Sequence, residues 1–298
     1  MDARAIFIVA FAVALACGIG PRQAAAAAKL QIVTTTTDLK SIVVAIGGDR
    51  IAVESLAAPS QDPHSLELKP NQLAHLRTAS LIVRIGLDHE PWLARMQSAA
   101  PLVDVSKNVR LLQTETPRLR LERRSHTHAF GNTHYWLDPE NARPMALDIT
   151  QALVKLSPAD KAYFEANLTS FLKRLDERMP LWKTALAPYA GTKLVVMHDT
   201  WAYFADRFKL SIVAAAEPTP GVPPSPAELA KLYARMREAK IGLVIADPNS
   251  NPALARQVAE YGNARIVNLV PSVGADPAAQ DYFSLIELNV ERLIKALR

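Results

Sequence analysis

Short apolar runs alternate with amphipathic segments along most of the chain. In the first part of the sequence, the apolar runs predict β-strands at residues 30–35, 51–56, 81–85 and 102–105. Helical periodicity follows them, in a segment that stops at Gly47 and in the segments at residues 71–77 and 90–98. The last third repeats this alternation, with strands expected at residues 193–197, 211–215, 242–246 and 266–269, and helices at residues 200–208, 226–239, 252–261 and 281–297. Strands and helices that alternate at this spacing are typical of parallel βα units. We therefore predict an α/β fold of two βα-sandwich lobes with parallel sheets.

A long amphipathic segment separates the two halves. Ser157 and Pro158 suit the N-cap and the first position of a helix, and apolar residues then recur every three or four positions up to residue 187. Such a helix would be roughly 45 Å long and could run along both lobes, with a kink expected at Pro180. We expect an N-terminal lobe at residues 29–138, a helical linker at 139–190 and a C-terminal lobe at 191–298.

The first 28 residues have the pattern of a secretory signal peptide. A single basic residue, Arg4, precedes an apolar run at residues 5–16, and a small-residue tract at 24–28 provides a cleavage site. The apolar run is shorter than the about 20 residues that a membrane-spanning helix needs. We therefore expect a periplasmic protein. A lipid anchor at Cys17, the only cysteine, is the alternative, and either case excludes an internal disulfide.

The charge balance does not indicate a nucleic-acid-binding protein. The chain has 34 basic and 29 acidic residues, a formal net charge of +5, and part of this excess lies in the arginines of a polar stretch at residues 114–124. His126 and His128 follow directly. Two interpretations of this region remain open, a flexible loop and a weak accessory metal site.

Three histidines each follow a predicted strand or a loop and precede a helix. They are His64, His134 and His198. Because side chains at strand ends gather at one edge of an α/β sheet system, these imidazoles could converge on a metal ion. No short metal signature such as HExxH or CxxC is present, so the spacing alone also allows three unrelated histidines.

Local motifs around these histidines distinguish the two interpretations. Pro-His-Ser-Leu-Glu at residues 63–67, His-Tyr-Trp-Leu-Asp-Pro at 134–139, His-Asp-Thr-Trp-Ala-Tyr-Phe at 198–204 and Pro-Ser-Pro-Ala-Glu-Leu at 224–229 occur in this order. Their combination resembles the periplasmic zinc- and manganese-binding proteins that feed ABC importers, and the similarity extends over residues 32–297. The resemblance implies a solute-binding protein, not an enzyme, that captures a divalent cation between two lobes and delivers it to a membrane permease. We expect it to act as a monomer whose long helix restricts lobe motion.

The ligand types favour zinc as the transported ion. Neutral imidazoles suit zinc better than manganese, which prefers carboxylates, and in the resembled family the position of His198 is histidine in zinc carriers and often glutamate in manganese carriers. The family commonly has an Asp-Pro pair after the penultimate strand, where this chain has Val270-Pro271. Asp276, Asp247 and water therefore remain three alternatives for the fourth ligand.

Other residues near these motifs have simpler expected roles. Glu67 and Asp138 could accept the second ring N–H of a ligand histidine. His75 is expected on a helix surface and His89 at the start of a helix, so neither is assigned to the metal.

A three-histidine zinc enzyme and a periplasmic metal chaperone are the alternatives to a transport receptor. An enzyme of this kind would keep an open position for a metal-bound water. No general base beside the ligands and no substrate-binding motif is apparent in the sequence, which favours the receptor.

Overall fold

The computed structural model describes residues 29–298, except residues 97, 113–130 and 218–221. The predicted signal peptide with Cys17 lies outside these residues, as do the arginines at 118–124, His126 and His128.

The N-terminal lobe is built on a four-stranded sheet in the order β2-β1-β3-β4, in which all neighbours are parallel. Its strands are β1 (Leu30–Thr34), β2 (Ile51–Ser55), β3 (Leu81–Arg84) and β4 (Leu102–Asp104). Helix α1 (Thr37–Gly47) begins where the Thr36 hydroxyl accepts a hydrogen bond from the Leu39 N–H. The apolar face of α1 is completely buried, so this helix covers the sheet as its periodicity predicts. Helix α2 (Pro70–Thr78) precedes β3.

The C-terminal lobe repeats this arrangement with a parallel sheet in the order β6-β5-β7-β8. Its strands are β5 (Lys193–Val196), β6 (Ser211–Ala215), β7 (Leu243–Ala246) and β8 (Arg265–Asn268), and its helices are α5 (Ala202–Arg207), α6 (Pro226–Glu238) and α7 (Pro252–Gly262). Helix α6 starts with a capping box between Ser225 and Glu228. The two parallel sheets with their helices confirm the predicted α/β fold class.

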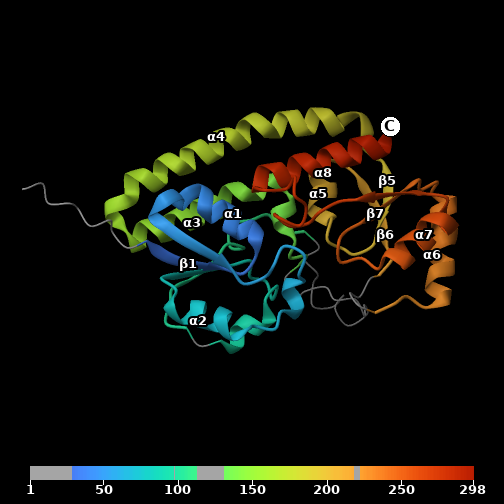
Figure 1. Cartoon of the computed structure of the whole chain (residues 1–298). Helices are drawn as coiled ribbons and strands as arrows, with labels where there is room; N and C mark the ends of the chain where they lie inside the picture. Colours follow the sequence, from blue (N-terminus) through green and yellow to red (C-terminus); the bar gives the residue numbers. More distant parts are fainter. Residues whose placement is uncertain (1–28, 97, 113–130, 218–221) are drawn as a thin grey trace, which may run out of the picture.

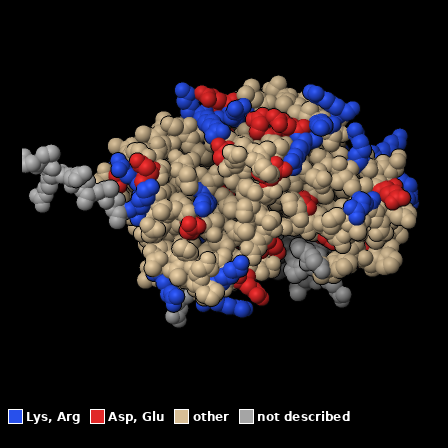
Figure 2. All heavy atoms as spheres, in the orientation of Figure 1, with Lys and Arg blue, Asp and Glu red and all other residues tan. Residues whose placement is uncertain are grey.

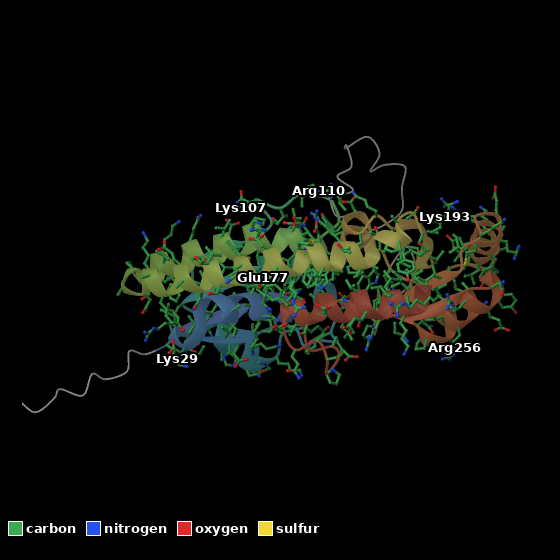
Figure 3. The ribbon with its side chains drawn as sticks, turned by 90° about the horizontal axis from the view of Figure 1, so that it is seen from above. Lys29, Lys107, Arg110, Glu177, Lys193 and Arg256 are labelled. Atoms are coloured by element: carbon green, nitrogen blue, oxygen red, sulfur yellow. The ribbon has the colours of Figure 1, made fainter. Side chains whose placement is uncertain are left out.

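Long helices connect the lobes. Helix α3 (Ala142–Leu156) leads into α4 (Lys161–Leu186), which extends over both lobes, and the final helix α8 (Tyr282–Leu297) lies beside it (Figures 1 and 3). Helix α4 has 26 residues, which corresponds to about 39 Å, and it buries one apolar face. It starts later than predicted, because the Ser157 hydroxyl donates to the Asp160 carboxylate and a 3₁₀ turn (Pro158–Asp160) precedes it.

A single hydrophobic cluster extends through both lobes. It contains Ile32 of the N-terminal sheet and Leu194 of the C-terminal sheet, together with buried residues of α3, α4 and α8. The lobes therefore share this largest part of their core, which is consistent with limited lobe motion, and each lobe has a smaller cluster of its own.

The prediction of a helix at residues 90–98 is wrong. The structure has a short 3₁₀ turn there, Pro91–Arg95, and the buried Glu90 side chain accepts hydrogen bonds from the Ile85 and Gly86 amides. Leu87 and Asp88 adopt positive φ angles of 56° and 60°. The chain therefore forms a tight turn after β3 rather than entering an α-helix.

Further 3₁₀ turns occur at Gly48–Arg50, Pro63–Ser65, Tyr135–Leu137, Pro139–Asn141 and Ala187–Tyr189. No helix within the described part of the chain is long and apolar enough to cross a membrane. Basic and acidic side chains are intermixed over the face in Figure 2, so the net positive charge does not form a single-sign patch there.

Candidate metal centre

Three imidazoles of the N-terminal lobe form a compact cluster. They belong to His64, His89 and His134, and one ring nitrogen of each lies within 4.8 Å of those of the other two. The ring centroids of His64 and His89 are 4.2 Å apart, and each lies 5.6 Å from that of His134. His89 is completely buried, whereas His64 and His134 are partly exposed. The cluster can therefore exchange an ion with its surroundings, and its donor set suits a divalent metal such as zinc.

His64 is held by a short rigid turn after β2. The Asp62 carboxylate accepts a hydrogen bond of 2.9 Å from the His64 N–H, and Pro63 occupies the first position of the turn. The Trp92 indole N–H donates to the Pro63 carbonyl over 2.7 Å, which ties this loop to the turn after β3. These contacts fix the backbone of the turn that carries His64.

His89 is the ligand candidate that the sequence interpretation missed. We expected a polar residue at a helix start, but the tight turn after β3 buries its ring beside the other two imidazoles. Its Nδ1 atom lies 2.8 Å from the Thr133 hydroxyl oxygen, so Nε2 is the nitrogen through which His89 would bind a metal. Its place shortly after the predicted strand at residues 81–85 was the pattern that could have identified it.

The Glu90 side chain fixes the turn that carries His89. Its carboxylate accepts hydrogen bonds from the Thr35 hydroxyl and from the amides of Ile85 and Gly86. Burial raises the pKa of Glu90 to about 7, although these hydrogen bonds oppose the shift. The side chain is therefore a structural support of the His89 turn.

His134 is positioned by Asn132. The Asn132 side-chain oxygen accepts from the His134 N–H over 2.9 Å and lies 3.1 Å from His134 Nδ1, while its amide group donates to the Asp199 carbonyl over 2.6 Å. Asn132 thus joins the His134 loop to the segment that follows His198 in the C-terminal lobe.

His198 lies between two carboxylates rather than within the imidazole cluster. In the sheet order β6-β5-β7, its strand β5 is flanked by the strands that lead to Glu217 and Asp247. His198 Nε2 is 2.6 Å from the Glu217 carboxylate and its Nδ1 is 3.6 Å from that of Asp247. Burial lowers the pKa of His198, but hydrogen bonding and charge at Asp247 and Glu217 outweigh it and raise the pKa above 6.5. Glu217 did not appear among the sequence candidates.

The two aspartates considered as fourth ligands are in different environments. Asp247 is buried, and its carboxylate also accepts hydrogen bonds from the Asn249 amide and the Ser250 hydroxyl. The Asp276 carboxylate forms an ion pair with Arg292 and accepts from the Ala278 amide, and both contacts hold its pKa below the usual value. The structure therefore brings Asp247 to His198, and it engages Asp276 in a salt bridge.

The two acids expected to support the ligand imidazoles lie in different environments. The Asp138 carboxylate binds Arg207 at 2.5 and 2.7 Å, and Glu67 is exposed. Thr133 lies beside the ring Nδ1 of His89, and Asn132 beside that of His134. His75 is exposed on α2, as predicted.

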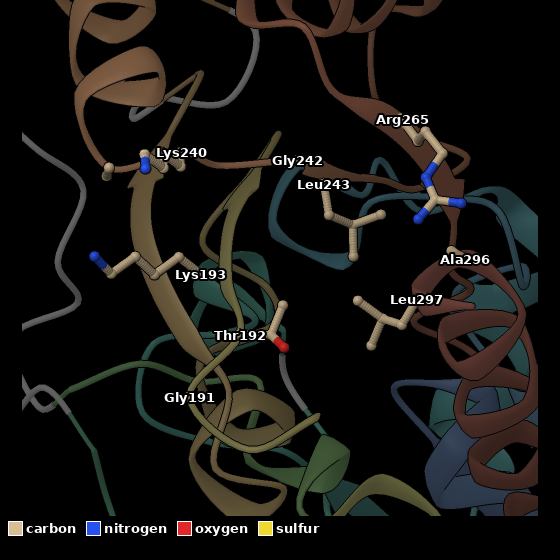
Figure 4. Close-up of a pocket in the computed structure, with 10 residues that line it drawn as sticks. Gly191, Thr192, Lys193, Lys240, Gly242, Leu243, Arg265, Ala296 and Leu297 are labelled. Carbon is tan, nitrogen blue, oxygen red and sulfur yellow. The ribbon is translucent and has the colours of Figure 1, made fainter. Parts of the chain in front are cut away.

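A pocket of about 400 Å³ lies at the opposite edge of the C-terminal sheet (Figure 4). It is lined by the first residues of three strands, Lys193, Leu243 and Arg265, and by the end of α8. The side chains of Leu243 and Leu297 face each other across it. His198 instead follows the carboxyl end of β5, so this pocket is separate from the histidine site.

Comparisons with known proteins agree with this architecture. The family described as the periplasmic component A of zinc-uptake complexes matches residues 32–296. The high-affinity zinc uptake protein ZnuA of Yersinia pestis is 28% identical over 270 residues, covering 82% of this chain and 83% of the relative. The manganese ABC transporter substrate-binding lipoprotein PsaA of Streptococcus pneumoniae is 24% identical, with 98% and 97% covered.

Solved structures show the same fold. A crystal structure of ZnuA superimposes with a TM-score of 0.76 at 27% identity, covering 91% of this chain and all of the other. A zinc-bound deletion mutant of ZnuA gives 0.77 at 27% identity, with 90% and 98% covered. These relatives are solute-binding proteins of ABC importers and not enzymes. The chain therefore belongs to the zinc-uptake component A family of periplasmic metal-binding proteins.

Proposed function

We propose that this chain is the periplasmic substrate-binding component of an ABC importer and that its cargo is zinc. The observation that carries the proposal is the cluster of His64, His89 and His134, with one nitrogen of each within 4.8 Å of the others. Imidazole nitrogens are preferred ligands of zinc, and manganese prefers carboxylate and water oxygens. The relatives include both zinc and manganese carriers, and the three imidazole ligands favour zinc of the two.

In this proposal His64 and His134 are ligands, as the sequence motifs suggest, and His89 is a third ligand from the same lobe. His198 is the contribution of the C-terminal lobe, with Asp247 and Glu217 beside it to accept its ring N–H or to approach the ion themselves. Asp276 is not among the proposed ligands, because Arg292 engages its carboxylate. Water could complete the coordination.

The proposed cellular role follows from the family. The signal peptide at residues 1–28 directs the chain to the periplasm, where it works as a monomer, captures zinc and delivers it to a membrane permease. Its ligand histidines must be neutral to bind, so affinity falls as the pH drops through the histidine range.

Zinc and manganese binding of the mature protein tests this function. Native protein is expected to hold one zinc ion and to prefer it to manganese in a competition assay. The triple variant His64→Ala, His89→Ala, His134→Ala is expected to bind none, whereas the exposed His75→Ala is the matched control and should bind as the native protein does. The proposal would be contradicted if the triple variant retained zinc, or if the native protein bound zinc and manganese with equal affinity.

A separate series examines the C-terminal contribution. His198→Ala, Asp247→Asn and Glu217→Gln are each made in the native background, and zinc affinity is measured by competition with a chelator. If His198→Ala loses zinc affinity and the other two variants keep it, His198 is a direct ligand and the two acids are not. An unchanged affinity in all three would restrict the site to the N-terminal lobe.

A further inference from the structure

The segment between β8 and α8 docks on the N-terminal lobe. We call residues 270–281 the docking segment. The Trp136 indole N–H donates to the Pro271 carbonyl over 2.9 Å, and the Val273 N–H donates to the Asp38 carboxylate over 2.9 Å. Directly after the segment, the Tyr282 N–H donates to the Ser41 hydroxyl over 2.9 Å. The Tyr282 hydroxyl also donates to the Trp136 carbonyl over 2.6 Å, so hydrogen bonds at several points fasten this segment and the start of α8 to the other lobe.

Asp38 is the only one of these fastening groups that titrates as an acid near neutral pH. It lies in the first turn of α1 and has no solvent exposure. One carboxylate oxygen accepts the Val273 N–H, and the other, Oδ2, is buried with no hydrogen-bond partner among the residues that the structure describes. Burial raises the pKa of Asp38 to about 7, although the Val273 amide and the Ser272 side chain oppose this shift.

Among the residues that the structure describes, no cationic side chain forms an ion pair with the Asp38 carboxylate. The charged groups on the elements around it have partners of their own: Lys40 pairs with Glu54, Arg174 with Asp281, Arg292 with Asp276, and Glu90 accepts from Thr35 and backbone amides. Tyr282 is a buried phenol whose pKa is raised, first by burial and then by the nearby carboxylates, Asp38 among them. An ionised Asp38 is therefore a buried charge whose Oδ2 atom has no hydrogen-bond partner among the described residues, which is unfavourable unless water reaches it.

From this geometry we propose that Asp38 is a positioning residue that holds the docking segment against α1 while it is neutral and loosens the segment when it ionises. Opening the contact exposes the carboxylate to water, so the ionised form favours the open arrangement by simple linkage. The proposal concerns the contact between the lobes, and it does not need any metal to be bound.

The docking segment is also linked to the histidine site through Trp136. The effect on zinc release that follows from this link rests on the proposed function. Pro271 of the docking segment binds Trp136, whose ring lies 5.2 Å from that of His134 and 5.3 Å from that of His89. Loosening of the segment removes this support of the imidazoles. Zinc release should therefore accelerate when Asp38 ionises.

Hydrogen exchange of the Val273 amide in the metal-free protein tests the proposal. With exchange rates corrected for intrinsic base catalysis, a group with a pKa near 7 when closed and near 3.8 when open should lower the protection about tenfold between about pH 6 and pH 8. Asp38→Asn keeps the shape and an acceptor oxygen but cannot ionise, so its protection should not change with pH. Ser41→Ala is the matched control: it removes a neighbouring hydrogen bond without removing the acid, so it should lower protection at every pH and retain the step.

The proposal is overturned if the protection of the Val273 amide does not change with pH in the native protein, or if Asp38→Asn shows the same change in protection. If Asp38→Asn does not fold, a carboxyl NMR titration of the native protein decides instead, because an Asp38 pKa near the ordinary value of 3.8 would contradict it. Zinc dissociation is measured separately. A native protein that shows the exchange step but binds no zinc contradicts the proposed function and leaves the role of Asp38 intact.

Discussion

The Nδ1 atom of His89 lies 2.8 Å from the hydroxyl oxygen of Thr133. Both side chains are completely buried, and Thr133 directly precedes His134. One hydroxyl therefore fixes the orientation of the third imidazole and belongs to the loop that presents another.

Replacing this hydroxyl should weaken zinc binding without unfolding the protein. Thr133→Val preserves shape but removes the hydrogen bond, and loss of such an orienting contact typically lowers metal affinity about 10- to 100-fold. Competition with a chelator measures the affinity. Thr133→Ser retains the hydroxyl and should stay close to native, so an equal loss in both variants would contradict an orienting role.

Gly86 should be required for the turn that presents His89. It has a φ of +78°, and an added Cβ would lie 2.3 Å from an Asp104 carboxylate oxygen. Gly86→Ala should therefore cost more than the about 1–2 kcal/mol of left-handed backbone strain and should also reduce zinc affinity. Gly191→Ala is the matched control, because Gly191 has a φ of +80° but open space around it. Denaturant unfolding and zinc titration of both variants separate strain from site damage.

The stability of the metal-free protein should depend on Glu217 in a pH-dependent way. The pKa of His198 is raised above 6.5, so the protonated imidazole contributes stability below that value and loses it as the pH rises through the raised pKa. Glu217→Gln should thus lower the melting temperature more at about pH 5.5 than at about pH 8.5. The exposed Glu238→Gln serves as the control. An equal loss at both pH values would show that Glu217 does not act through the His198 charge.

The buried ion pair of Asp138 with Arg207 should matter more than the exposed pair of Arg143 with Asp176. Asp138 is 1% exposed in its side chain, and Arg207 reaches it from α5. Arg207→Met leaves this carboxylate buried and unpaired, which should cost about 3–5 kcal/mol of unfolding free energy. Arg143→Met breaks the exposed pair with Asp176 and should cost less than about 1 kcal/mol. Urea unfolding compares them, and similar losses would contradict the argument from burial.

Local periodicity was sufficient for most of the elements. The strands β1 and β5 lie close to their predicted positions because they are short apolar runs that are buried on both faces. The helices α6, α7 and α8 do so because each buries one apolar face and starts at a recognisable cap residue. The turn after β3 departed from the prediction, since the buried Glu90 carboxylate competes with helical hydrogen bonding through contacts that periodicity does not encode.

Some residues of the candidate site were indicated by the sequence, and others were found only in the tertiary structure. Motifs in the sequence pointed to His64, His134 and His198, each of which follows a predicted strand or a loop. Only the sheet order β2-β1-β3 brings the loops after β2 and β3 to one edge and places His89 beside His64. Only the order β6-β5-β7 puts His198 between Glu217 and Asp247. Strand order is set by which buried faces pack together across the whole lobe, so these long-range neighbours are decided by the tertiary structure and not by any local stretch of sequence.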